Sequence, residues 1–191
     1  MSQALIDAMK AAEEAFLRNA RTDLPYGIRE GSPPIAPWPT KPCKIAFLDF
    51  DGVLNSEQSV KQLGTRYRFA RANVNVLNEV LKHTDALLVI TSSWRENWNL
   101  KEIATFLERD GVVPGRVVGK TRALGGERGI EIDAWLCSVP YVVESFVILD
   151  DKDDMAMHLN RFVRINEQIG LTYSEAQRAI ELLSIPWRKK L

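Results

Sequence analysis

The sequence predicts an α/β protein in which a mainly parallel sheet is covered by helices on both faces, as a three-layer sandwich. Two observations indicate this class. Short apolar runs, such as IAFL at 45–48 and FVIL at 146–149, have the length and composition of buried strands. Segments with apolar residues at helical spacing alternate with these runs, which is typical of parallel strands joined by helical crossovers.

The strands and helices of the main domain are expected from residue 43 onward. In chain order they are a strand at 44–49, a helix near 72–83, a strand at 86–91, a helix near 97–109, a strand at 116–119, a helix near 128–138, a strand at 142–149, a strand around 162–165 and a helix at 173–184. The last helix opens with Thr172 followed three residues later by Glu175, which is the capping-box pattern.

Residues 1–42 are predicted to form a separate N-terminal part. Apolar residues within 3–19 recur at helical spacing and predict an amphipathic helix. The segment 27–42 contains five prolines, which neither continue a helix nor pair as a central strand, so it is expected to be an irregular tether. We therefore divide the chain into an N-terminal helical arm with its tether at 1–42 and a main domain at 43–191. The arm is a candidate lid over the site.

The composition gives no general preference for a charged partner. Lys plus Arg and Asp plus Glu each number 25, so attraction to nucleic acid has to come from a local patch. Cys43 and Cys137 are too few for a disulfide scaffold. No apolar stretch has the length of a membrane span, and the first residues lack the apolar region of a secretory signal. We expect a cytoplasmic protein with no membrane partner.

Polar side chains follow three of the predicted strands. They are Asp49 and Asp51 after the first strand, Thr91, Ser92 and Ser93 after the strand at 86–91, and Asp150 and Asp151 after the strand at 142–149. The carboxyl ends of parallel strands meet at one crevice, where ligands bind. Carboxylates crowded there repel one another unless a cation is present. Oxygen donors without histidine or cysteine favour Mg²⁺ over zinc, so the sequence predicts a magnesium and phosphate site.

Three motifs resemble those of the haloacid dehalogenase (HAD) superfamily. DFDGVLN at 49–55, LLVITSS at 87–93 and FVILDDKDD at 146–154 are similar to its first, second and fourth motifs. Together with TSSWR, RGIEIDAWL and GLTYSEAQRAIELL, they resemble more narrowly the capless HAD domain associated with RNA-repair (Swiss Army Knife) proteins. The resemblance implies a Rossmann-like, HAD-like α/β/α fold without a large cap domain.

The resemblance also implies roles in catalysis. Asp49 would be the nucleophile that attacks phosphorus and becomes an aspartyl-phosphate. Asp51 would protonate the leaving oxygen, later take a proton from water, and bind the metal through its main-chain carbonyl. Thr91, with Ser92 as the alternative, would donate a hydrogen bond to the phosphoryl oxygens.

The metal set implied by the resemblance consists of four aspartates around Mg²⁺. Asp151 would ligate the ion directly and Asp150 would orient the site or its waters, alongside Asp49 and Asp51. The third motif of the family supplies a cation that links the nucleophile to the phosphate.

Two residues compete for this third-motif role. The family places the cation at the start of the helix before the fourth-motif strand, which favours Arg128. Lys120 stays open as the alternative.

The segments where the family inserts cap domains, here about 56–85 and 96–127, have no room for a full cap. An open crevice favours large substrates. The sequence therefore predicts a Mg²⁺-dependent phosphatase for phosphorylated nucleic-acid ends, with RNA ahead of DNA. A phosphatase for nucleotides or other small phosphoesters is the second hypothesis. A non-catalytic phosphate-binding module is the third, and the intact Asp49 and Asp51 argue against it.

Two further features have two open interpretations each. The basic stretch 61–71 either grips a phosphodiester backbone, with Tyr67 or Phe69 stacking on a base, or is a solvated face with two buried aromatics. Trp94 and Arg95 either frame the substrate entrance or, for the tryptophan, pack in the core.

Overall fold

The structure, a computed structural model, describes residues 39–187. The predicted helix at 3–19 and most of the tether at 27–42 lie outside these residues, so the division at residue 42 stays a prediction. None of the described helices is long and apolar enough to cross a membrane.

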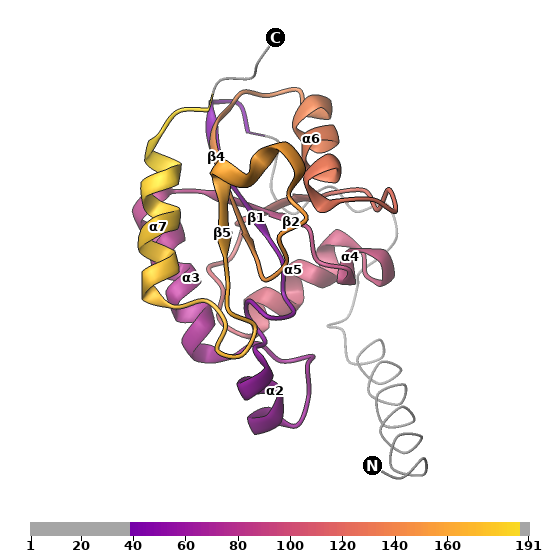
Figure 1. The fold of residues 1–191 in the computed structure, drawn as a ribbon, viewed down its shortest axis with the longest axis vertical. Helices are drawn as coiled ribbons and strands as arrows, with labels where there is room; N and C mark the ends of the chain where they lie inside the picture. The colour runs from indigo at the N-terminus through magenta and orange to yellow at the C-terminus, as the bar shows by residue number, and fades with distance from the viewer. Residues whose placement is uncertain (1–38, 188–191) are drawn as a thin grey trace. The chain divides into compact units, whose positions relative to one another are not determined.

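The centre of the main domain is a five-stranded sheet in which every pairing is parallel. Its order is β3-β2-β1-β4-β5 (Figure 1). The strands are β1 (Cys43–Leu48), β2 (Leu87–Ile90), β3 (Val117–Lys120), β4 (Val143–Asp150) and β5 (Phe162–Arg164). Within the described residues the first strand, β1, is therefore the central one. Strands β2 and β3 follow on one side of it, and β4 and β5 on the other.

Helices connect the strands and cover both faces of the sheet. They are α2 (Glu57–Leu63), α3 (Arg71–Thr84), α4 (Trp94–Asn97), α5 (Leu100–Arg109), α6 (Arg128–Ser138), the 3₁₀ helix η1 (Ala156–Arg161) and α7 (Tyr173–Ser184). Figure 1 shows α3 and α7 together on one side of the sheet and α6 on the other. The predicted three-layer α/β class is confirmed.

The core explains why β1 is central. All residues from Ile45 to Leu48 are fully buried. Ile45 and Phe47 belong to the core that includes Trp135 of α6, and the rings of Phe47 and Trp135 meet edge-on with centroids 5.4 Å apart. Ala46 and Leu48 alternate with them and point to the opposite face. Burial on both faces gives the continuous apolar run that predicted this strand.

The structure adds elements that the sequence pattern did not indicate. No helix was expected between the strand at 44–49 and the helix near 72–83, but α2 lies there. Ser56 caps its N-terminus, and Gly64 ends it in a left-handed conformation (φ 69°). The helix expected near 97–109 begins at Leu100 as α5, because Asn99 forms a capping box with Glu102. The short helix α4, which was not expected, ends before it at Asn97. The predicted capping box at Thr172 is present. Between β1 and β2 the described chain holds α2 and α3, and between β2 and α6 it holds α4, α5 and β3, so these residues contain no cap domain.

Candidate functional site

Strand register places the predicted site residues side by side. Leu48 is paired with Ile90 on one side and with Leu149 on the other. The residues that follow them are Asp49, Thr91 and Asp150. The hydrogen-bond ladder continues one step further, since the amide of Asp49 donates to the carbonyl of Leu149 and the amide of Thr91 donates to that of Leu48, both at 3.0 Å. The convergence expected at the carboxyl ends of the strands follows directly from this register.

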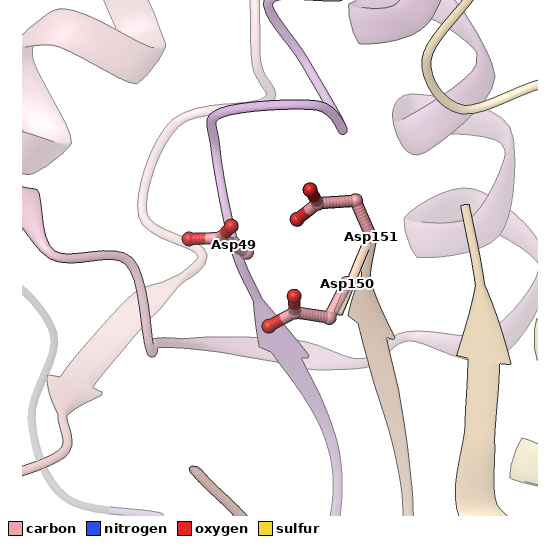
Figure 2. Close-up of side chains that lie close together, drawn as sticks. All are labelled: Asp49, Asp150 and Asp151. Atoms are coloured by element: carbon pink, nitrogen blue, oxygen red, sulfur yellow. The ribbon is translucent and has the colours of Figure 1, made fainter. Parts of the chain in front are cut away.

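Asp49, Asp150 and Asp151 form a compact acidic cluster. Each contributes a carboxylate oxygen, and these oxygens all lie within 4.8 Å of one another (Figure 2). The side chains come from the ends of β1 and β4. The Oδ1 atom of Asp151 is buried and has no hydrogen-bond partner among the described residues. An all-carboxylate cluster with an unpartnered buried oxygen fits a hard divalent cation such as Mg²⁺.

A glycine brings the turn after β1 close to Asp151. Gly52 has a φ of 81°, and a Cβ atom there would lie 2.8 Å from Cγ of Asp151. The turn is tight because the carbonyl of Phe50 accepts hydrogen bonds from the amides of Val53 and Leu54. Only glycine combines this backbone conformation with so close an approach. The Asp-x-Asp-Gly sequence is therefore required by geometry as well as by chemistry.

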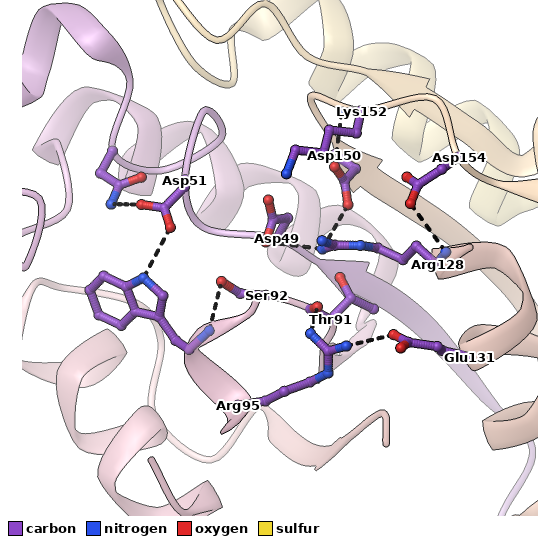
Figure 3. Close-up of polar contacts among 12 residues, drawn as sticks. Asp49, Asp51, Thr91, Ser92, Arg95, Arg128, Glu131, Asp150, Lys152 and Asp154 are labelled. Carbon is purple, nitrogen blue, oxygen red and sulfur yellow. Dashed lines mark hydrogen bonds and ion pairs between the residues drawn. The ribbon is translucent and has the colours of Figure 1, made fainter. Parts of the chain in front are cut away.

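Arg128 lies between two of the carboxylates. Its Nη1 atom is 3.1 Å from Oδ1 of Asp49 and 3.0 Å from Oδ2 of Asp150 (Figure 3). Burial disfavours the charged guanidinium, but Asp49 and Asp150 outweigh this effect and raise the pKa of Arg128. A permanent positive charge is thus held against the predicted nucleophile.

Lys120, the alternative cation, is directed elsewhere. Its Nζ donates to the main-chain carbonyls of Arg95 at 2.7 Å and Trp98 at 2.8 Å. Burial and the charge of Arg95 lower the pKa of Lys120. Lys120 therefore ties the end of β3 to α4, and of the two cations Arg128 is the one that contacts Asp49.

Burial changes the protonation of the two buried aspartates. Asp49 is 4% exposed and Asp150 is 0% exposed. Burial raises the pKa of Asp49, although Arg128 opposes this. Burial and the neighbouring Asp49 raise the pKa of Asp150 to about 8. Arg128 only partly offsets the effect of burial on these two carboxyl groups, so a further positive charge beside them would favour their ionised forms.

Two neutral donors hold Asp51. The side-chain amide of Asn55 donates to Oδ1 at 2.8 Å and the indole of Trp94 donates to Oδ2 at 3.1 Å. Trp94 is 7% exposed and packs against Phe50 and Phe69. It is therefore a core residue, as one of the two interpretations had it. Neither interpretation of Trp94 included the hydrogen bond that its indole donates to Asp51.

Thr91 and Ser92 are both fully buried. The hydroxyl of Thr91 has no partner among residues 39–187, whereas the hydroxyl of Ser92 accepts from the amide of Trp94 at 3.5 Å. The buried Arg95 donates to the carbonyl of Thr91 and pairs with Glu131 of α6. Arg95 therefore fixes the end of β2 from inside, and the interpretation that it frames the substrate entrance is wrong.

A cavity of about 540 Å³ opens above the acidic cluster. Its lining includes Asp49, Asp51, Asp151 and Ser93, and the basic residues Lys61, Arg66, Arg128 and Lys152. The basic side chains and the aromatic side chains of the stretch 61–71 therefore lie in different environments. Lys61 and Arg66 face the cavity, while Phe69 is buried and Tyr67 packs on Trp94. Stacking of a base on Phe69 is excluded by this burial.

Comparison with protein families agrees with this geometry. A model of the family described as "HAD domain in Swiss Army Knife RNA repair proteins" matches residues 45–176. The chain belongs to this HAD family. The match extends from β1 into α7 and contains every strand-end motif, so the resemblance predicted from those motifs is confirmed.

One solved structure similar to this HAD domain is the HAD domain of the effector protein Lem4 from Legionella pneumophila. The two are 16% identical with a TM-score of 0.46, and the similarity covers 73% of this chain and 94% of that one. No curated protein matches the sequence.

The HAD domain also contains positioning residues that the motifs did not indicate. The carbonyl of Asp154 accepts from the amide of Gly129 at 3.0 Å, and its carboxylate accepts from the amide of Arg128 at 3.3 Å. A Cβ atom at Gly129 would lie 2.0 Å from the carbonyl oxygen of Met155, so the start of α6 packs directly on backbone. The glycine after the arginine in RGIE was the available signal in the sequence.

Proposed function

We propose that this HAD domain is a Mg²⁺-dependent phosphomonoesterase that acts through an aspartyl-phosphate on Asp49. The observation that carries the proposal is the contact of a buried carboxylate, Asp49, with the guanidinium of Arg128 inside a cluster of three aspartates. A nucleophile, a fixed cation and an oxygen-rich cation site are the parts that phosphoryl transfer needs.

The proposed reaction has two steps. A carboxylate oxygen of Asp49 attacks phosphorus, and the bond to the leaving oxygen breaks while Asp51 gives that oxygen a proton. Water then attacks phosphorus of the aspartyl-phosphate, Asp51 takes a proton from it, and Asp49 and inorganic phosphate are released. Arg128 neutralises charge on the phosphoryl group, and the unpartnered hydroxyl of Thr91 donates to a phosphoryl oxygen.

Mg²⁺ would be held by Asp49 and Asp151, with the main-chain carbonyl of Asp51. When bound, it supplies positive charge that lets a carboxylate approach an anionic phosphate. Asp150 is fully buried and contacts Arg128, so its role in the proposal is to orient that arginine.

For the substrate we propose the phosphorylated ends of RNA. The description of the family and the lack of a cap domain within residues 39–187 support this choice. A second candidate is a nucleotide or other small phosphoester, because a cavity of about 540 Å³ is within the size range of small-molecule sites.

The test is phosphate release from 5′- and 3′-phosphorylated oligoribonucleotides, the matching oligodeoxyribonucleotides, and mononucleotides, with Mg²⁺ and with a chelator. We expect release that requires Mg²⁺ and a loss on the order of 10³-fold or more in Asp49→Asn. Full turnover by Asp49→Asn would exclude the covalent mechanism. A large preference for mononucleotides would select the second candidate.

A further inference from the structure

The side chain of Asn55 connects Asp51 to the loop between α2 and α3. Its amide donates to Oδ1 of Asp51 at 2.8 Å and to the carbonyl of Arg66 at 2.7 Å. In the proposed reaction Asp51 protonates the leaving oxygen, so the group attached to that oxygen lies next to Asp51. Arg66 is then on the leaving-group side of the phosphoryl site.

This loop is held in a fixed position. The carbonyl of Tyr67 accepts from Arg109 at 2.7 Å, and the amide of Phe69 donates to Asp110 at 2.8 Å. Arg68 forms an ion pair with the same carboxylate of Asp110 at 2.8 Å. A loop that is ordered before binding loses little entropy when a ligand contacts it.

Arg66 is the arginine of this loop that faces the cavity. It is exposed, lines the cavity wall, and its guanidinium makes no hydrogen bond or ion pair within residues 39–187. Lys61 of α2 lines the same wall, and its pairing with Glu57 is exposed and long, at 3.8 Å. An arginine without a protein partner at the wall of a phosphate site is suited to a second phosphate group.

The opposite side of the cavity does not suit a nucleic-acid strand. It adjoins a hollow of about 620 Å³ beside β5, whose acidic lining consists of Asp151, Asp153, Glu167 and Glu175. Asp151 and Glu167 also line the cavity itself, and Glu57 lines it on the side of α2. Of the two cations that line the hollow, Lys152 and Arg164, the latter is paired with Asp153 at 3.2 Å. A phosphodiester backbone is repelled by this surface and attracted by the wall that carries Arg66.

We infer that Arg66, assisted by Lys61, binds the phosphodiester group next to the terminal phosphate, so that the strand leaves the site over α2 and not over β5. The inference deepens the proposed function and depends on it. Arg66 is then a specificity-determining residue, because a mononucleotide with one phosphate leaves it without a ligand.

The test compares Arg66→Ala with Arg164→Ala, which removes an equal charge from the acidic side. The kcat/KM is measured for a phosphorylated oligoribonucleotide and for a small aryl phosphate, with Mg²⁺, at several salt concentrations. We expect Arg66→Ala to lower the oligonucleotide value about 10-fold and the aryl phosphate value less than about 2-fold. The salt slope for the oligonucleotide becomes shallower by about 0.7. Arg164→Ala changes neither substrate by more than about 2-fold.

The inference is overturned if Arg66→Ala leaves the oligonucleotide value unchanged or lowers both substrates equally. If the wild-type protein hydrolyses the aryl phosphate in either case, the proposed function stands. If it hydrolyses no substrate, the proposed function fails, and the role of Arg66 in binding a phosphodiester group is then tested by a binding measurement. In that measurement the anisotropy of a labelled phosphorylated oligoribonucleotide is followed without Mg²⁺. A Kd about 10-fold higher for Arg66→Ala than for Arg164→Ala supports the subsite, and equal Kd values exclude it.

Discussion

Gly129→Ala tests whether the start of α6 places Arg128 for catalysis. The new Cβ would lie 2.0 Å from the carbonyl oxygen and 2.2 Å from the carbonyl carbon of Met155, and both are backbone atoms that cannot rotate away. Relief to an acceptable separation requires the helix and this backbone to move apart by roughly 1 Å. If the helix moves by that amount away from the carboxylates, the distance from Nη1 of Arg128 to Asp49 increases from 3.1 Å to about 4 Å. The distance from Nη1 to Asp150 increases from 3.0 Å to about 4 Å in the same way.

The expected cost follows from this displacement. Misplacement of a catalytic group by about 1 Å lowers turnover by roughly 10²-fold, and overpacking costs about 1–3 kcal/mol of unfolding free energy. The assay is kcat on a small aryl phosphate with Mg²⁺, at a temperature where circular dichroism shows the variant to be folded. The control is Gly126→Ala, because no atom lies within 4 Å of a Cβ built there. Wild-type kcat and melting temperature in Gly129→Ala would refute the reasoning.

Three further predictions concern other residues. We expect Mg²⁺ to raise the melting temperature of the wild-type protein, and we expect Gly52→Ala to abolish both this rise and turnover, because its Cβ would lie 2.8 Å from Cγ of Asp151. The control is Gly64→Ala, where φ is 69° but no atom lies within 4 Å of the added Cβ, so this variant has the backbone strain without the clash. Equal losses in the two variants would show that the clash with Asp151 is not the cause. Trp94→Phe should lower kcat roughly 10-fold with little change in KM, because it removes the donor to Asp51; a similar loss in Trp98→Phe, whose ring packs on Phe106, would point to packing instead. Burial lowers the pKa of His158, although Asp133 opposes this, so the unfolded chain takes up a proton before the folded one. The contribution of His158 to stability is therefore present above pH about 6.5 and is lost as the pH falls below it, which melting of wild type and His158→Asn between pH 5 and 8 would measure; parallel pH curves would exclude it.

The position of the acidic cluster was predictable from the sequence because it depends on backbone register. The carboxyl ends of neighbouring parallel strands lie at the same edge of the sheet, and the pairing of Leu48 with Ile90 and Leu149 places Asp49, Thr91 and Asp150 next to one another. The strand order depends on topology, which a pattern of apolar runs determines well. Arg128 was favoured over Lys120 because the HAD resemblance places the third-motif cation at the start of the helix before the fourth-motif strand, and α6 begins at Arg128.

The contacts of Asp51 were not predictable in the same way. They depend on the turn after β1, which brings Asn55 back to Asp51, and on α4, which presents the indole of Trp94. Both are local arrangements of short segments with no periodic pattern. The close approach at Gly129 depends on a loop 26 residues later in the chain, which reaches α6 only in the folded domain. The contacts of Lys120 could likewise not be predicted, because they depend on where the main-chain carbonyls of Arg95 and Trp98 lie in the folded domain.

The charges of the site support the proposed dependence of Asp49 on an added cation. In the proposed reaction Asp49 attacks as a carboxylate, yet burial raises its pKa, and burial together with Asp49 raises the pKa of Asp150 to about 8. Arg128 contacts both groups and supplies one positive charge, which is fewer than the buried carboxylates and an approaching phosphate require. Asp151 has a buried oxygen without a partner in the described chain, directly beside Asp49. A divalent ion held at that oxygen would favour the ionised form of Asp49 and would also attract the phosphate, so we expect metal and substrate each to strengthen the binding of the other.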